Sequence, residues 1–324
     1  MAAHNTYFIA RSAFVLVMLL CTRTADAQSD QHYTMFLYNK LLYNPAYAGS
    51  KDITSATGDY RTQWTGINGA PKTLNATIDG PVGNYMLPFR KVATGLTIAN
   101  EKIGVENNTN IMGYYAYRIR IENSTLSFGL RAGVKMYTAR YSQLNLSQPN
   151  DLTFSRDVVR AVLPNTGAGI YWYRDNAYAG FSVPNLLQNY YDKKEKPNPK
   201  AKEVRGYYFS GGYVFPVSED INVEPQLLTR YAGNRLYRLP FNCDFNVTGI
   251  FYERFIAGLT YRTDKSFEFI VHLQATKNIN IGYSYDYLLS ELSAYDRSTH
   301  EIVIGYDFIR DNSKYLTPRI IRAF

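Results

Sequence analysis

The stretch LSFGLRAGVKM, from Leu126 to Met136, decides the fold class, because its residues alternate between two kinds without interruption. One set is apolar, and the residues between its members are small or basic. The apolar set is Leu126, Phe128, Leu130, Ala132, Val134 and Met136, and the second set is Ser127, Gly129, Arg131, Gly133 and Lys135. A period of two residues is typical of a β-strand whose two faces meet different environments.

The same alternation recurs at residues 114–121, 279–285 and 302–308. The second face of these segments is rich in Gly and Ser, whereas the polar face of a water-exposed sheet is richer in Lys, Glu and Thr. Small inward-facing residues suit the lumen of a filled barrel. The chain has 30 Tyr and 17 Phe but only 2 Trp, and no window of about 18 apolar residues follows residue 27. We therefore expect an all-β protein, a transmembrane antiparallel β-barrel.

Segments of this kind number about fourteen, an even count within the range of transmembrane barrels. Their predicted starts lie near Asp52, Lys72, Lys91, Asn107, Ser124, Pro164, Asn176, Arg205, Asp220, Arg238, Arg254, Ser266, Asn278 and His300. With this count, tight turns fall on one side, at residues 122–124, 174–176, 218–220, 253–254 and 277–278, and long loops on the other, at residues 141–163, 184–204 and 288–299. Barrels of this type have short periplasmic turns, so both termini are expected to be periplasmic.

The first residues have the layout of a secretory signal. Arg11 precedes a short apolar core, SAFVLVMLL, and residues 25–27 form an A-x-A cleavage site. The predicted organisation is a signal peptide over residues 1–27, an N-terminal segment over 28–51, a barrel over 52–308 and a short periplasmic tail over 309–324. Leu20 before Cys21 argues against a lipoprotein signal, and cleavage leaves Cys243 as the only cysteine, without a disulfide partner.

The N-terminal segment contains YNKLLYNPAYAGS, from Tyr38 to Ser50. Pro45 removes a backbone donor and restricts Asn44 to extended geometry, whereas Gly49 permits a positive φ. These residues predict a turn-like lead into the barrel, and a plain surface loop is the alternative.

At this point the chain resembles the PorP/SprF family of outer-membrane proteins, which is associated with type IX secretion and gliding motility. The resemblance rests on QHYTMFLYNKLLYNPAYAGS (residues 31–50), YRTQWTGINGAPKT (60–73), ANEKIG (99–104), YYAYRIRI (114–121), PNTGAGIYWY (164–173), GFSVPNLL (180–187), IGYSYDY (281–287) and HEIVIGYDF (300–308). The most specific of these motifs is NPAYAGS, residues 44–50. The matches cover nearly the whole chain after the signal, in order.

The resemblance implies an outer-membrane barrel of a Gram-negative cell. It implies a barrel that works with the periplasmic ring lipoprotein of the secretion and gliding machinery, or that anchors a secreted adhesin through the adhesin's C-terminal domain. It leaves open which of these roles applies, and it does not name the partner. The resemblance also suggests that the N-terminal segment plugs the lumen or meets a partner at the periplasmic mouth. The candidate residues for this role are Tyr38, Tyr43, Asn44, Pro45, Tyr47 and Gly49.

The inward phase of two neighbouring predicted strands carries four basic residues, Arg118, Arg120, Arg131 and Lys135. Further inward charges are expected at Arg262, Asp286 and Asp307. Paired lumen charges are one interpretation, and an anion-preferring pore or an electrostatic seat for a plug is another. A small-solute porin or transporter is therefore the alternative function.

No enzyme class is indicated. Beyond the signal, the histidines are His32, His272 and His300, far apart in sequence, and the chain has no H-E-x-x-H or G-x-S-x-G motif. We expect no catalytic, metal or cofactor site. The formal charge of +8 comes from basic residues scattered along the chain, so it predicts no nucleic-acid partner.

Overall fold

The computed structural model describes residues 38–83, 90–143, 158–190, 203–233, 241–263, 265–289 and 298–309. The predicted signal peptide and nearly all of the predicted C-terminal tail lie outside these residues, as does most of the charged stretch 192–203. Within the described chain, no helix is long and apolar enough to cross a membrane.

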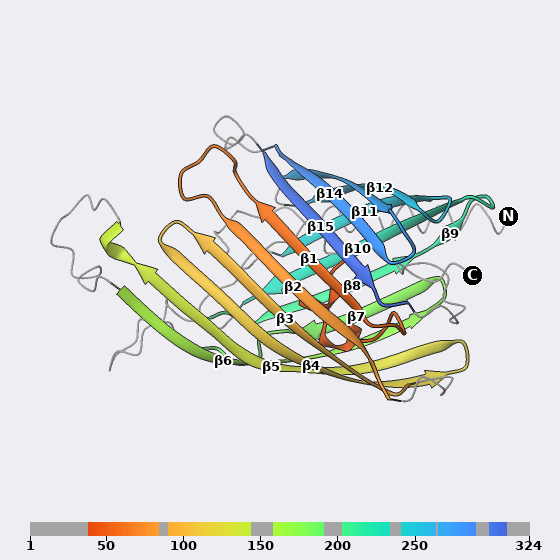
Figure 1. Ribbon diagram of the computed structural model, residues 1–324, viewed down its shortest axis with the longest axis horizontal. Coiled ribbons are helices and arrows are strands. Elements are labelled where there is room, and N and C mark those ends of the chain that lie inside the picture. The colour runs from red at the N-terminus through yellow and green to blue at the C-terminus, as the bar shows by residue number, and fades with distance from the viewer. Residues whose placement is uncertain are drawn as a thin grey trace.

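The described chain is a single antiparallel sheet in which successive strands are neighbours (Figure 1). The strands are β1 (Ser55–Thr62), β2 (Lys72–Val82), β3 (Val92–Ile103), β4 (Glu106–Ile121), β5 (Ser124–Arg140), β6 (Val158–Arg174), β7 (Ala177–Val183), β8 (Gly206–Tyr213), β9 (Phe215–Pro216), β10 (Ile221–Ala232), β11 (Asn242–Phe251), β12 (Phe255–Arg262), β13 (Ser266–Gln274), β14 (Ile279–Leu288) and β15 (Thr299–Asp307). β1 pairs with β15 and β10 with β11, which closes the sheet into a barrel.

The barrel has fourteen strands, as the sequence predicted. The two-residue β9 continues β8 beyond Val214, and both pair with β10, so together they form one strand of the wall. Closure pairs the first and last strands, β1 and β15, whose outer edges would be free in an open sheet.

The outer face of the wall is apolar and the inner face is polar. Leu130 and Val162 are each 60% exposed on the outside, whereas Arg118, Glu224 and Glu268 are completely buried inside. This distribution is the reverse of a soluble protein, in which charged residues are seldom fully buried. It is the pattern of a barrel whose outside faces lipid.

The two ends of the barrel differ in their connections. All five predicted tight turns lie at the end that we call the turn edge, and the three predicted long connections lie at the opposite end, the loop edge. Two connections at the loop edge are nevertheless short, between β3 and β4 and between β12 and β13. The β5–β6 hairpin reaches farther at the loop edge than the other strands (Figure 1).

One predicted strand start is wrong. The sequence placed it near Pro164 and assigned residues 141–163 to a loop, but β6 begins at Val158. A proline cannot donate a hydrogen bond to a neighbouring strand, so within a sheet it is normally confined to edge strands, strand starts or bulges. Here the nitrogen of Pro164 faces the side of β6 that has no strand partner at that level, so the strand runs through it.

Candidate functional site: a filled lumen

Residues 38–53, which we call the plug, lie inside the barrel and contain two short 3₁₀ turns, η1 (Lys40–Leu42) and η2 (Pro45–Tyr47). Asn44 precedes η2 in the extended conformation that Pro45 imposes, and its side chain accepts a hydrogen bond from the Ala46 nitrogen at 3.0 Å. Gly49 has a φ of 70°, which a glycine adopts without strain. The local geometry therefore agrees with the sequence expectation.

The plug is seated against glycines of the wall. η2 packs on β4, β5 and β6. A Cβ atom at Gly129 would lie 2.1 Å from the Ala46 nitrogen, and one at Gly169 would lie 2.2 Å from the Asn44 Oδ1. Any side chain at these two positions would collide with the plug, so the small residues of the inward face create its seat.

Hydrogen bonds join the plug to several strands. Asn44 Nδ2 donates to the Ile170 carbonyl at 3.0 Å, and Ser182 Oγ donates to the Tyr43 carbonyl at 2.7 Å. The Gly49 nitrogen donates to Asp79 Oδ2 at 2.8 Å. These contacts tie the plug to β6, β7 and β2.

The three tyrosines named from the sequence all lie against aromatic residues of the wall. Tyr38 stacks on His272 with ring centroids 4.2 Å apart. Tyr43 lies 5.6 Å from Tyr208, and Tyr47 meets Tyr171 edge-on at 5.5 Å. Such pairs add to the stabilisation from burial alone, so the aromatic richness of the sequence serves the interior as well as the outer surface.

Two of the predicted basic residues hold the plug through its backbone. Arg118 donates to the Gly49 carbonyl at 2.6 Å and to Asp52 at 2.7 Å, and it also contacts the Arg90 carbonyl. Arg131 donates to the Leu42 carbonyl at 3.2 Å. Guanidinium groups suit this role because they carry five donors in a fixed geometry.

The other two predicted basic residues do not touch the plug in this way. Lys135 forms an ion pair with Glu203 at 3.0 Å. Arg120, two residues nearer the turn edge than Arg118, is exposed. The structure thus brings Arg118 and Arg131 together at the plug and leaves Lys135 and Arg120 apart from it.

Lys40 is a buried cation of the plug itself. Its Nζ lies 3.6 Å from the centre of the Tyr178 ring, a cation–π contact. Burial lowers the pKa of Lys40, and the nearby Glu224 acts in the opposite direction. Tyr178 in turn donates to Gln226 at 2.8 Å. Through Tyr178 the plug is therefore linked to β7 and β10.

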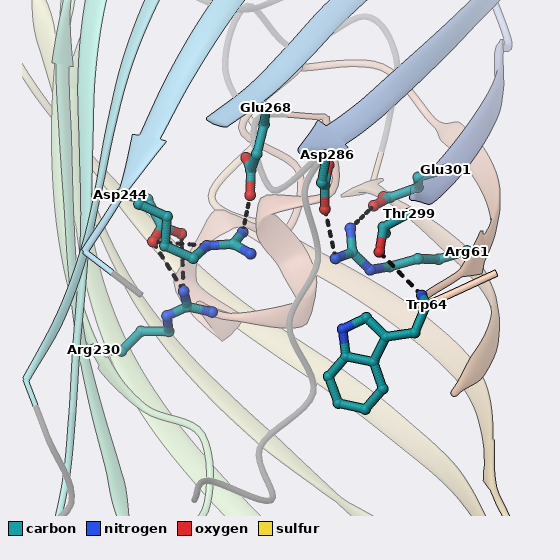
Figure 2. A network of polar contacts seen from close by, with 9 residues as sticks. Arg61, Trp64, Arg230, Asp244, Glu268, Asp286, Thr299 and Glu301 are labelled. Carbon is teal, nitrogen blue, oxygen red and sulfur yellow. Dashed lines mark hydrogen bonds and ion pairs between the residues drawn. The ribbon is translucent and has the colours of Figure 1, made fainter. Parts of the chain in front are cut away.

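A second polar group, which we call the charge belt, lines the lumen on seven consecutive strands from β10 through β15 to β1 (Figure 2). Its members are Arg230, Asp244, Arg262, Glu268, Asp286, Glu301 and Arg61. Arg61 contacts Asp286 at 2.8 Å and Glu301 at 3.0 Å. Asp244 joins Arg230 at 3.0 Å and Arg262 at 3.1 Å, and Arg262 also pairs with Glu268.

The sequence identified Arg262 and Asp286 of this belt and missed the other five residues. Each of the seven successive strands carries a charged residue on its inward-facing side, near its loop-edge end. This pattern is the signal that the sequence prediction missed. Asp307, the third predicted inward charge in this part of the chain, is buried at the other end of β15, 4.0 Å from Lys51. It therefore belongs with the plug and not with the belt.

The described residues contain no group of three or more His, Cys, Asp or Glu side chains that could hold a metal ion. The belt carboxylates are instead paired with arginines. Chemically, the filled lumen offers paired charges and buried hydrogen bonds, which suit the fixing of a plug.

Replacing Asn44 with alanine is expected to loosen the plug. The change removes the hydrogen bond to the Ile170 carbonyl and the one from the Ala46 nitrogen. Each buried group left without a partner costs about 1–3 kcal/mol. Faster amide exchange across residues 38–50, measured by mass spectrometry, with unchanged exchange in β12–β14, is the expected result. Uniform exchange rates in both proteins would contradict this role of Asn44.

Comparison with known proteins agrees with the barrel fold. The family model of the type IX secretion system membrane protein PorP/SprF matches residues 25–306. The Ralstonia pickettii toluene transporter TbuX superposes with a TM-score of 0.50 at 12% identity, over 82% of this chain and 92% of that chain.

Two further outer-membrane proteins align over most of their length. A Pseudomonas aeruginosa FadL homologue aligns at 10% identity over 83% of this chain and 94% of that chain, with a TM-score of 0.44. The Acinetobacter baumannii protein Omp33 aligns at 7% identity over 79% and 98%, also with a TM-score of 0.44. No curated protein matches the sequence. The family match covers most of the chain, and the chain belongs to the PorP/SprF family of type IX secretion system membrane proteins.

Proposed function

We propose that this outer-membrane barrel is a non-enzymatic docking component of the type IX secretion and gliding machinery. It binds the periplasmic ring lipoprotein of that machinery, or it anchors a secreted adhesin through the adhesin's C-terminal domain. In this proposal the leader of residues 1–27 is removed on export, residues 52–308 form the membrane domain, and the turn edge and both termini are periplasmic.

The observation that carries the proposal is the seat of the plug. A pore for solutes needs a free path, whereas here residues 38–53 occupy the lumen and are held by Arg118, Arg131 and the wall glycines. The charge belt adds paired charges near the loop edge. A barrel filled in this way is better suited to present its two ends to other proteins than to conduct solutes, which disfavours the porin alternative.

Co-purification tests the proposal. A C-terminal tag on the full chain, membranes solubilised in mild detergent and mass spectrometry of the eluate are expected to recover the periplasmic ring lipoprotein or a large adhesin. An identically tagged outer-membrane barrel of unrelated function serves as the control. Recovery of the barrel alone, together with ion conductance in a planar bilayer, would overturn the docking function in favour of a porin.

A further inference from the structure

The β5–β6 hairpin leaves one strand edge open. β5 and β6 each have 17 residues, whereas β7 has 7. β7 pairs with β6 only along Ala168–Arg174. Within the described chain, residues 158–167 of β6 therefore have no strand partner on that side. β-Strands that cross a membrane need about 9–11 residues, so the hairpin is long enough to project beyond the bilayer at the loop edge.

A loop covers the part of this open edge that lies next to β7. The Leu186 nitrogen donates to the Thr166 carbonyl at 2.8 Å, and Asn189 Nδ2 donates to the Pro164 carbonyl at 2.8 Å. These two contacts show that the carbonyls of even-numbered residues face the open side. The N–H of a strand residue points the same way as its carbonyl. Between Pro164 and the loop-edge end of β6, the backbone donors and acceptors of Val158, Arg160 and Val162 thus face the open side.

The remaining part of the edge, residues 158–163, is packed against β5. Its inward side chains, Ala161 and Leu163, are buried in a cluster with Tyr137 and Ala139 of β5. Its outward side chains stay accessible, with Val158 39% and Val162 60% exposed. The edge sequence VVRAVL, residues 158–163, is rich in β-branched residues. A long apolar edge of this kind is a template for pairing with another strand.

We infer that the free edge of β6, residues 158–163, binds an extended segment of a different protein, not of a second copy of this chain, as an added β-strand. Only an extended backbone supplies donors and acceptors at the spacing that Val158, Arg160 and Val162 present. Arg140 and Arg160 are exposed on the outward face, and neither forms an ion pair with a described residue. The guest strand is therefore expected to carry an acidic residue opposite Arg160.

The chain's own residues 192–203, DKKEKPNPKAKE, are a poor occupant. They contain two prolines, which remove backbone donors, and five lysines, which would meet Arg140 and Arg160 with like charge. The inference rests on the proposed function in one respect, because an exported protein of the secretion machinery would supply the guest strand. The open edge itself does not depend on that function.

A defined peptide tests the edge directly. The probe is a fluorescent nonapeptide of alternating Thr and Val with one central Glu, titrated against the purified full chain in detergent. We expect saturable binding, weakened at least about tenfold when alternate amides of the peptide are N-methylated, because each methyl removes one edge hydrogen bond. The N-methylated peptide tests the edge without changing the protein.

Two substitutions at one position separate backbone pairing from charge. Arg160→Pro removes a donor that faces the open side and leaves the pairing with β5 intact, so we expect a loss of about tenfold or more. Arg160→Ala keeps that donor and removes the charge, so a smaller loss that high salt masks is expected. Equal binding of both peptides, or undiminished binding by Arg160→Pro, would overturn the inference.

Other occupants give distinct results. A dimer that becomes monomeric in Arg160→Pro would identify a second copy as the guest and overturn the inference. Amide protection at residues 158–163 in the isolated chain, lost on deletion of residues 192–202, would identify the chain's own loop and also overturn it. Peptide binding without any co-purified partner would count against the proposed function and support the edge. Undiminished adhesin recovery with Arg160→Pro would count against the edge alone.

Discussion

Deletion of residues 39–50 is expected to turn an insulating barrel into a conducting one. The interior of a barrel widens with strand number, and side chains alone fill barrels of about eight strands. This barrel has fourteen, and residues 38–53 supply the additional filling. We expect the wild-type chain in planar bilayers to show little current and the deletion variant to show stepwise conductance, on the order of tenfold higher or more.

A pair of glycine substitutions provides a sharper version of this experiment. Gly129→Val places a side chain where its Cβ would lie 2.1 Å from the Ala46 nitrogen, so the plug cannot keep its seat. Gly113→Val is the matched control, because Gly113 lies on the outer face of β4. A Cβ atom at Gly113 would lie 3.8 Å from its nearest neighbour, the Ala132 carbonyl oxygen. We expect conductance with Gly129→Val and none with Gly113→Val.

The same measurements can contradict the role of the plug. If the deletion and Gly129→Val both leave the current at the wild-type level while the barrel stays folded, residues 38–53 do not close the lumen. Folding is checked by the slower gel mobility of the heated sample relative to the unheated one. Conductance in the wild-type chain itself would instead favour the porin alternative.

The sequence predicted the features that depend on neighbouring residues. Strand alternation has a period of two, and the turns at residues 122–124 and 174–176 have local signatures, so the strand number and most of the starts agree with the structure. The inward phase of Arg118 and Arg131 followed from the same alternation. The predicted start of β6 was wrong, because the open edge that lets this strand run through Pro164 cannot be recognised from local sequence.

The partners of the inward residues could not be predicted. Arg118 binds the Gly49 carbonyl, and Arg131 binds the Leu42 carbonyl. Backbone carbonyls carry no sequence signal, so these contacts appear only when the plug is placed in three dimensions. Arg61 and Glu301 are 240 positions apart and meet because β1 closes the barrel against β15. Barrel closure sets this contact, and alternation along one strand does not report it.

The charge belt is expected to contribute strongly to stability, and Arg61 is the residue that tests it. Arg61 lies between two carboxylates, Asp286 at 2.8 Å and Glu301 at 3.0 Å, and all three side chains are almost fully buried. Arg61→Met keeps much of the side-chain volume but removes the guanidinium that both carboxylates contact. Removal of one partner from a buried ion pair typically costs about 3–5 kcal/mol.

The expected result is a lower free energy of unfolding for Arg61→Met, measured by guanidinium titration of the chain in lipid vesicles. The matched control combines Arg61→Met with Asp286→Asn and Glu301→Gln, which removes the charges left behind. Replacing a buried ion pair with neutral groups of similar volume is often close to neutral, so this triple variant should recover most of the lost stability. A triple variant as unstable as Arg61→Met would mean that packing around Arg61, and not its charge, supports the wall where β1 meets β15.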